Sequence, residues 1–85
     1  MKKRRDTTRK ESASKSAPAE RLVFARNFRK ARKDAGLTQQ AIKDRTGFAQ
    51  SWISEVETGR STINLDNMAT LAEVVGIPLW KLLIP

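Results

Sequence analysis

Apolar residues recur at helical spacing along most of the chain, and no stretch sustains the apolar–polar alternation of a strand. The first such pattern spans residues 19–35, where apolar positions are separated by three or four residues. Gly36 follows, and glycine accepts the left-handed conformation that commonly ends a helix. We therefore expect a helix over residues 19–35. Its predicted buried stripe consists of Phe24, Phe28, Ala31 and Ala35.

The next stretch, residues 39–58, predicts two short helices around a tight turn. Thr38 is positioned to cap the first helix, and Gly47 stands where the chain must reverse. In the second, expected over residues 49–58, Ile53 and Val56 are three apart and share one face. Two helices joined by a short Gly-containing turn form a helix-turn-helix. The residues left pointing outward are Gln50, Ser51, Ser54 and Glu55, polar side chains able to contact base edges.

Residues 59–85 predict a loop and two further helices. Asn64 is the expected N-cap of a helix that Gly76 ends, and Pro78 suits the start of a last short helix because its missing N–H is harmless there. The predicted inner face of the longer helix consists of Leu65, Met68, Leu71, Ala72 and Val75. The fold expected is all-α, a compact five-helix bundle with a central helix-turn-helix. Its expected buried core includes Phe28, Leu37, Ile42, Phe48, Ile53, Val56, Leu65, Leu71 and Val75.

The amino-acid composition excludes several classes of function. The chain has 85 residues, enough for one small domain, and contains neither cysteine nor histidine. Disulfides, thiolate metal sites and the commonest general base are therefore excluded, and we expect no enzymatic activity, metal or cofactor. No apolar run is long enough to span a membrane, and no apolar segment follows the charged N-terminus. These features predict a cytoplasmic protein.

The formal charge of +8 indicates a polyanionic partner, with nucleic acid the first candidate and an anionic membrane surface the second. Residues 1–18 carry +5 of this charge without apolar periodicity, so we expect a disordered basic tail followed by the domain at residues 19–85. The tail has two interpretations, a solvated extension or a basic arm that binds DNA. The candidate contacts in such an arm are Lys2, Lys3, Arg4 and Arg5.

The run GLTQQAIKDRTGFAQSWISEVETGRS, residues 36–61, resembles the phage repressor and Cro-type (XRE) helix-turn-helix family, which has a lambda-repressor-like fold. The matching features are Gly36-Leu37-Thr38-Gln39, Ile42, Gly47, Gln50-Ser51, Ile53-Ser54, Glu57 and Gly59. The resemblance extends over about residues 24–83. Lys43 replaces a usually small residue, and Thr46 replaces an often aliphatic one. We expect the Lys43 stem to cover apolar surface while its ammonium stays in water.

The resemblance implies roles for individual residues. Gln50 should read a base, most naturally adenine through a bidentate amide pair. Ser51 and Glu55, four residues apart on one face, are also expected to read bases, Glu55 by accepting from cytosine N4. Glu55 has the alternatives of repulsive tuning or a local salt bridge with Arg45, and Trp52 is either a core residue or a further DNA contact. The expected phosphate contacts are Gln39, which would also brace Gln50, together with Lys43, Arg60, Ser61 and Thr62. An ion pair between Arg32 and Glu57 should join two helices.

The last helix is too apolar for a domain of this size to bury completely, which argues for a partner. Trp80 and Leu83 have three interpretations, as core residues, as a dimer contact or as part of an aggregation-prone terminus. In the resembling family this helix often supplies a two-fold dimer contact, here through Leu79, Trp80 and Leu83. The function predicted is a transcriptional regulator that binds a palindromic double-stranded DNA operator as a homodimer and occludes or recruits RNA polymerase. The resemblance implies a phage repressor or a restriction–modification controller in a bacterial or phage-infected cell. The alternatives are an antitoxin that binds a protein toxin and a basic membrane-surface protein.

Overall fold

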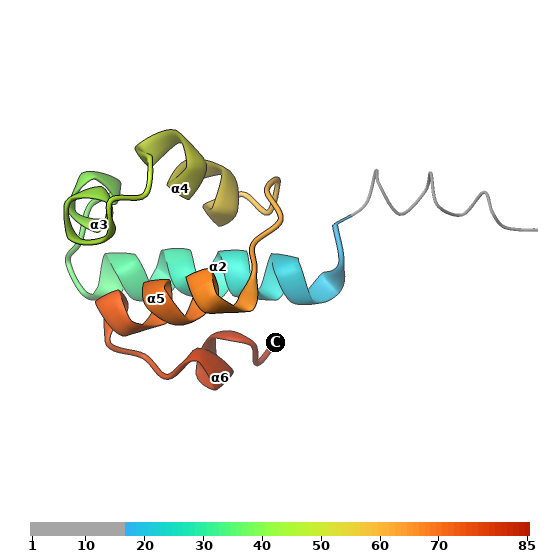
Figure 1. Ribbon diagram of the computed structural model, residues 1–85. Helices are drawn as coiled ribbons and strands as arrows, with labels where there is room; N and C mark the ends of the chain where they lie inside the picture. The colour runs from blue at the N-terminus through green and yellow to red at the C-terminus, as the bar shows by residue number, and fades with distance from the viewer. Residues whose placement is uncertain (1–16) are drawn as a thin grey trace, which may run out of the picture.

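The computed structural model describes residues 17–85, which form five α-helices and no strand. The helices are α2 (Ala19–Asp34), α3 (Gln39–Thr46), α4 (Gln50–Glu57), α5 (Leu65–Val75) and α6 (Leu79–Leu82) (Figure 1). The predicted all-α, five-helix fold is confirmed. The predictions for Lys2, Lys3, Arg4 and Arg5 lie outside the described residues.

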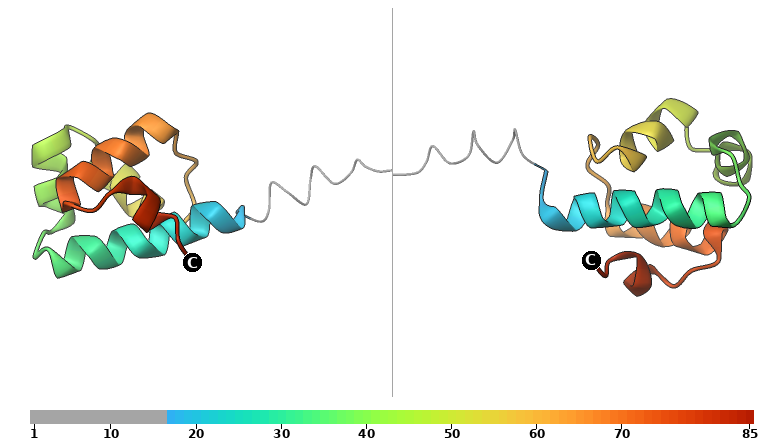
Figure 2. Two further views of the ribbon diagram at one scale, coloured as in Figure 1. Left: turned by 90° about the horizontal axis from the view of Figure 1, so that it is seen from below. Right: turned by 180° about the vertical axis from the view of Figure 1, so that it is seen from behind.

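Helix α2 is the longest helix, and three of the other four pack against it. It contacts α4, α5 and α6, while α3 contacts α4 and α5. Figure 1 shows α3 and α4 together on one side of α2 and α5, with α6 on the opposite side. The view from behind shows the same arrangement, and in the view from below α6 lies nearest the viewer (Figure 2). The helix-turn-helix is therefore held out on one side of the domain.

The helix ends follow the capping residues. The Thr38 hydroxyl accepts a hydrogen bond from the Ala41 N–H at 3.0 Å, and the Asn64 side chain accepts one from the Asn67 N–H at 2.7 Å. Gly47 ends α3 with φ +82°, a conformation that side chains other than glycine rarely adopt. The hydrogen bonds made by Thr38 and Asn64 satisfy backbone N–H groups at the starts of helices, which have no partner inside the helix. All three predicted roles are confirmed.

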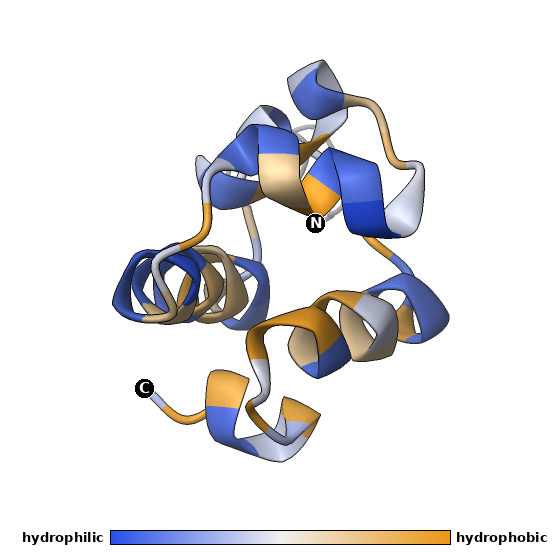
Figure 3. Ribbon diagram, turned by 90° about the vertical axis from the view of Figure 1, so that its left-hand side faces the viewer, coloured by the Kyte–Doolittle hydropathy of each residue, from blue (hydrophilic) through white to orange (hydrophobic). Residues whose placement is uncertain are grey.

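The core lies where the inner faces of the helices meet, and Figure 3 shows apolar segments turned largely toward this space. Its buried residues are Phe24, Phe28, Ile42, Ile53, Val56, Leu71, Ala72, Val75 and Leu82. The predicted core residues Leu37 and Phe48 are only partly buried and pack against this cluster. Phe24 and Phe28 stack with ring centroids 5.9 Å apart, which extends the apolar stripe of α2 into the centre.

Two core predictions are wrong. Leu65 is 65% exposed, although its spacing from Leu71 and Ala72 assigns it to the inner face of α5. It is the first residue of that helix, and no neighbouring helix covers its side chain there. Ala35 is exposed because α2 ends at Asp34 and Ala35 is already its C-cap. The apolar periodicity identified the inner face of each helix. It did not show how much of that face the neighbouring helices cover.

Candidate nucleic-acid interface

Helix α4 presents the exposed polar face of the helix-turn-helix. Ile53 and Val56 are buried on its inner side. Gln50, Ser51 and Glu55 are exposed, whereas Ser54, also predicted to point outward, is partly buried. Within residues 17–85, no ion pair joins Glu55 to Arg45, so that alternative for Glu55 is wrong. The Glu55 carboxylate therefore stays on the exposed face of α4 together with Gln50 and Ser51.

Trp52 is partly buried and packs against the core. Its ring stands edge-on to Phe48, with centroids 4.9 Å apart and an interplanar angle of 62°. Edge-to-face pairs of this kind stabilise beyond the area they bury. Trp52 thus joins the start of α4 to the turn that precedes it. Of its two interpretations, the packing role is the one the geometry shows, because much of the indole is already in contact with protein.

A buried ion pair fixes the orientation of α4. Arg32 Nε donates to Glu57 Oε2 at 2.6 Å, and Nη2 donates to Oε1 at 2.9 Å. Arg32 Nη1 also donates to the Leu37 carbonyl at 2.8 Å. Both side chains are buried. The pair implied by the family resemblance is therefore present, and its bidentate geometry joins α2, α4 and the segment that leads into α3.

Gln39 completes this network instead of bracing Gln50. Its Nε2 donates to Glu57 Oε1 at 3.1 Å. A carboxylate has more acceptor sites than one guanidinium fills, so the buried Glu57 gains from a third donor. The predicted side-chain brace to Gln50 is wrong in this respect. The first residue of α3 is instead tied to the last residue of α4, which closes the helix-turn-helix at its open end.

Thr46, which departs from the family pattern, stabilises the turn. Its hydroxyl donates to the Ile42 carbonyl at 2.7 Å and accepts from the Phe48 N–H at 3.1 Å. An aliphatic residue at this position would leave that N–H without this partner. Lys43, the other departure, is exposed, and α3 and α4 remain in contact. The expectation that its ammonium stays in water is confirmed.

The loop after α4 carries the predicted phosphate contacts. Arg60 and Thr62 are exposed, while Ser61 is partly buried and its hydroxyl donates to the Thr62 carbonyl at 2.9 Å. The N–H groups of Arg60 and Ser61 donate to the Glu55 carbonyl at 2.9 and 3.3 Å. These bonds hold the loop close to the end of α4. Ser61 uses its own hydroxyl proton locally, so Arg60 and Thr62 are the better placed of the three for phosphate.

The start of α2 supports this loop, a role that sequence reasoning missed. Arg21 Nε donates to the Gly59 carbonyl at 3.0 Å. Gly59 has φ +77°, and a Cβ there would lie 2.6 Å from Leu22 Cδ2. The backbone conformation favours glycine at this position, and the terminal methyl group of Leu22 would have to shift to admit a Cβ. The two segments lie 38 residues apart in sequence, and no local pattern signals their contact.

The three predicted dimer residues in the C-terminal segment differ in their exposure. Leu79 and Leu83 are partly buried and pack on the core, whereas Trp80 is 62% exposed. Asn27 Nδ2 donates to the carbonyls of Leu82 and Ile84 at 3.0 and 2.8 Å, which holds this segment against α2. The exposed apolar surface is therefore formed by Trp80 and Ile84. None of the helices described in residues 17–85 has the length and apolar character to cross a membrane.

With this geometry in place, comparison with known proteins assigns the family. A family model described as a helix-turn-helix domain matches residues 23–79, from the second turn of α2 to the first residue of α6. The chain belongs to this helix-turn-helix family. The match covers the buried ion pair, the exposed face of α4 and the loop that follows it.

Named relatives support the same assignment. The chain is 32% identical over 65 residues to the uncharacterized HTH-type transcriptional regulator y4dJ of Sinorhizobium fredii (strain NBRC 101917 / NGR234), covering 76% of this chain and 84% of that protein. It is also 32% identical over 65 residues to a hypothetical transcription factor of Neisseria meningitidis serogroup B (strain ATCC BAA-335 / MC58), covering 76% of this chain and 61% of that protein. The protein is thus a helix-turn-helix transcriptional regulator.

Solved structures agree with the fold. The crystal structure of the hypothetical transcription factor NHTF from Neisseria has a TM-score of 0.72 at 32% identity, covering 82% of this chain and 84% of that one. The restriction–modification controller protein C.AhdI from Aeromonas hydrophila has a TM-score of 0.70 at 28% identity, covering 76% of this chain and 98% of that one. Both similarities extend over most of the described residues.

Proposed function

We propose that this regulator binds a specific double-stranded DNA sequence by inserting α4 into the major groove. The proposal rests on one observation about α4. The inner side of this helix is fixed by buried contacts, while its outer side is exposed. The buried Arg32–Glu57 pair fixes α4, while Gln50, Ser51 and Glu55 remain exposed. Sequence-specific readout needs this combination, because a base contact discriminates only when its donor and acceptor atoms are held in register.

The proposed contacts divide into those that read bases and those that position the protein. Gln50 is the principal base reader, since an amide pairs bidentately with adenine, and Ser51 and Glu55 are placed to contact neighbouring base pairs. Arg60, Thr62 and Lys43 are proposed to contact phosphates, which fixes orientation without reading sequence. Gln39 is proposed to contribute to phosphate binding through its position at the N-terminus of α3, because its side-chain amide is already bonded to Glu57.

The protein is further proposed to act as a homodimer on a palindromic operator. Trp80 and Ile84 form an exposed apolar surface at the C-terminal end, and an isologous contact would let each meet its copy or a near neighbour. Dimers with this motif bind half-sites one helical turn apart, about 34 Å. The similarity to the controller protein C.AhdI favours a controller-like or repressor-like regulator.

Selection of bound sequences from a random DNA pool, followed by footprinting, tests both parts of this proposal. A two-fold-symmetric consensus with half-sites one turn apart is expected. Enrichment of an asymmetric single site would contradict the dimer, and no enrichment would contradict sequence-specific binding. Sedimentation of the wild type and Trp80→Glu provides the independent measurement of association. The variant should be monomeric at concentrations where the wild type is dimeric.

The basic arm is proposed to add phosphate contacts through Lys2, Lys3, Arg4 and Arg5. The described chain begins next to the phosphate-contacting loop, since Pro18 and Thr62 line the same surface groove. Deletion of residues 1–16 should weaken binding to all DNA sequences alike. It should also flatten the slope of log affinity against log salt by about 0.9 for each phosphate that the arm neutralises. An unchanged slope would favour the solvated extension.

A further inference from the structure

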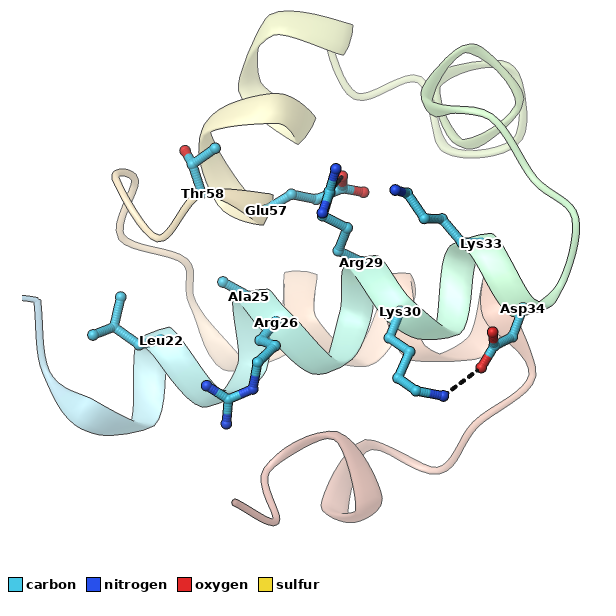
Figure 4. A pocket seen from close by; sticks show the side chains of 9 residues that line it. All are labelled: Leu22, Ala25, Arg26, Arg29, Lys30, Lys33, Asp34, Glu57 and Thr58. Carbon is cyan, nitrogen blue, oxygen red and sulfur yellow. Dashed lines mark hydrogen bonds and ion pairs between the residues drawn. The ribbon is translucent and has the colours of Figure 1, made fainter.

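The positive charge of the described domain is concentrated away from the predicted base-reading residues. Residues 17–85 contain ten Lys and Arg and seven Asp and Glu. Four of those ten cations line a single surface groove between α2 and the end of α4 (Figure 4). They are Arg26, Arg29, Lys30 and Lys33, whose spacing of three and four places them on one side of α2. The floor of this groove includes Leu22 and Ala25.

Two of the four cations point toward α4. Figure 4 shows the Arg29 and Lys33 side chains directed to the side where Glu57 lies, whereas Arg26 and Lys30 point away from it. Lys30 is bonded to Asp34 at 2.8 Å, and this hydrogen bond raises the Lys30 pKa. Arg29 and Lys33 are therefore the pair that faces the helix-turn-helix.

Neither Arg29 nor Lys33 donates a hydrogen bond to a carboxylate of residues 17–85. Arg29 Nε lies 3.9 Å from Glu57 Oε1, but that carboxylate already accepts two bonds from Arg32 and one from Gln39. The Arg29 side chain is 55% exposed. No carboxylate of residues 17–85 forms an ion pair with Lys33. Two exposed cations thus stand above a carboxylate whose charge Arg32 has already balanced.

The groove is continuous with the exposed face of α4. Thr58, the C-cap of α4, lines the groove and follows Glu55 by three residues, so it continues the exposed side that also carries Ser51. Its hydroxyl donates to the carbonyls of Ser54 and Glu55, so it offers no proton to a ligand and only marks where the two surfaces meet. DNA that occupies the exposed face of α4 would therefore bring its backbone to the mouth of the groove.

We propose that Arg29 and Lys33 form a phosphate-binding site for the DNA strand that passes the C-terminal end of α4. This inference rests on the proposed function, and it adds α2 to the contacts of the helix-turn-helix and its following loop. A guanidinium donates two parallel hydrogen bonds to a phosphate, and an adjacent ammonium adds a point charge. The continuity with the proposed base-reading face favours a phosphodiester backbone over an acidic protein segment.

Charge-neutralising substitutions test the site. The probe is a fluorescently labelled random-sequence duplex of about twenty base pairs, titrated at several salt concentrations. Arg29→Gln and Lys33→Gln should each weaken binding and reduce the slope of log affinity against log salt by up to about 0.9, the value for one phosphate contact. Arg26→Gln is the matched control, because it removes the same charge from an exposed side chain of α2 that points away from α4. It should leave the slope unchanged.

The possible outcomes separate this inference from the function on which it rests. If wild-type protein binds the duplex and the Arg29 and Lys33 variants behave like Arg26→Gln, the phosphate site is overturned while DNA binding stands. A wild type that does not bind the duplex would overturn DNA binding itself. Arg29→Lys retains the charge and should keep most of the slope, which distinguishes a phosphate contact from a purely structural role. Lys33→Gln replaces an exposed side chain, so it tests the site even if Arg29→Gln perturbs folding.

Discussion

Arg32 of α2 and Glu57 of α4 are joined by two hydrogen bonds, of 2.6 and 2.9 Å, and both residues are more than nine-tenths buried. A buried charge is tolerated only when it is paired and hydrogen-bonded. Here the guanidinium also binds the Leu37 carbonyl, and the carboxylate also accepts from Gln39. The pair thus converges on the segments that begin and end the helix-turn-helix, so its loss should affect both stability and the orientation of α4.

Arg32→Ala should lower the free energy of unfolding by about 3–5 kcal/mol, because it leaves the Glu57 charge buried without its partner. Arg29→Ala is the matched control. Its Nε lies 3.9 Å from the same carboxylate but its side chain is largely exposed, so the change should be within about 0.5 kcal/mol. Urea denaturation of both variants checks this. A double-mutant cycle of Arg32 and Glu57 without coupling would mean that the pair does not act as a unit.

Ile53 and Leu65 provide a second matched comparison. Ile53 is fully buried on the inner face of α4, and Ile53→Ala should cost about 2–5 kcal/mol because apolar burial is reduced and a cavity is left behind. Leu65 is 65% exposed, so Leu65→Ala should change the unfolding free energy by no more than about 0.5 kcal/mol. Equal losses of stability in thermal or chemical denaturation would show that the burial of these two positions is wrong.

Gly59→Ala should destabilise more than Gly36→Ala. Both glycines have positive φ, +77° and +75°, where a side chain costs roughly 1–2 kcal/mol. Only at Gly59 does the added Cβ also meet another side chain, Leu22 Cδ2 at 2.6 Å, whereas nothing lies within 4 Å at Gly36. Leu22→Ala combined with Gly59→Ala should remove the difference between the two glycine variants. Additive effects on stability would indicate that the contact with Leu22 is unimportant.

Gln50→Ala and Arg60→Ala should separate base reading from positioning. Gln50→Ala is expected to cost about 1–3 kcal/mol on the selected operator, concentrated at one symmetry-related base pair per half-site, with little change on random DNA. Arg60→Ala should weaken binding to operator and random DNA together. The measurement is a set of affinities for operator, single-base variants and random DNA at one salt concentration. A uniform decrease in affinity with Gln50→Ala would show that this residue does not read a base.

Helix boundaries were predictable because their signals act within a few residues. Thr38 and Asn64 cap the residues three positions ahead, and Gly47 adopts the conformation that only glycine takes readily. The buried stripe of α2 and the inner face of α4 followed from apolar spacing. The Arg32–Glu57 pair, in contrast, was implied by family resemblance and not by any local pattern.

The interactions that sequence reasoning missed or placed wrongly join segments distant in the sequence. Leu65 has the right periodicity for the core, yet no neighbouring helix reaches it. Gln39 donates to Glu57 instead of bracing Gln50, because the packing of α3 on α4 brings a buried carboxylate within its reach. The same holds for Arg21 and the Gly59 carbonyl. No rule based on spacing anticipates such partners, since which side chains meet depends on how the helices are placed against one another.

The sequence by itself determined where the helices begin and end, which side of each is apolar, and that two of them form a helix-turn-helix, because these properties depend on local backbone preferences and side-chain periodicity. The tertiary structure decided which polar side chains remain exposed for a ligand. Trp52 packs on Phe48, whereas Arg29 and Lys33 stand beside the end of α4 with exposed side chains. Exposure and charge clustering are properties of the packed surface, so they arise only when all the helices are in place.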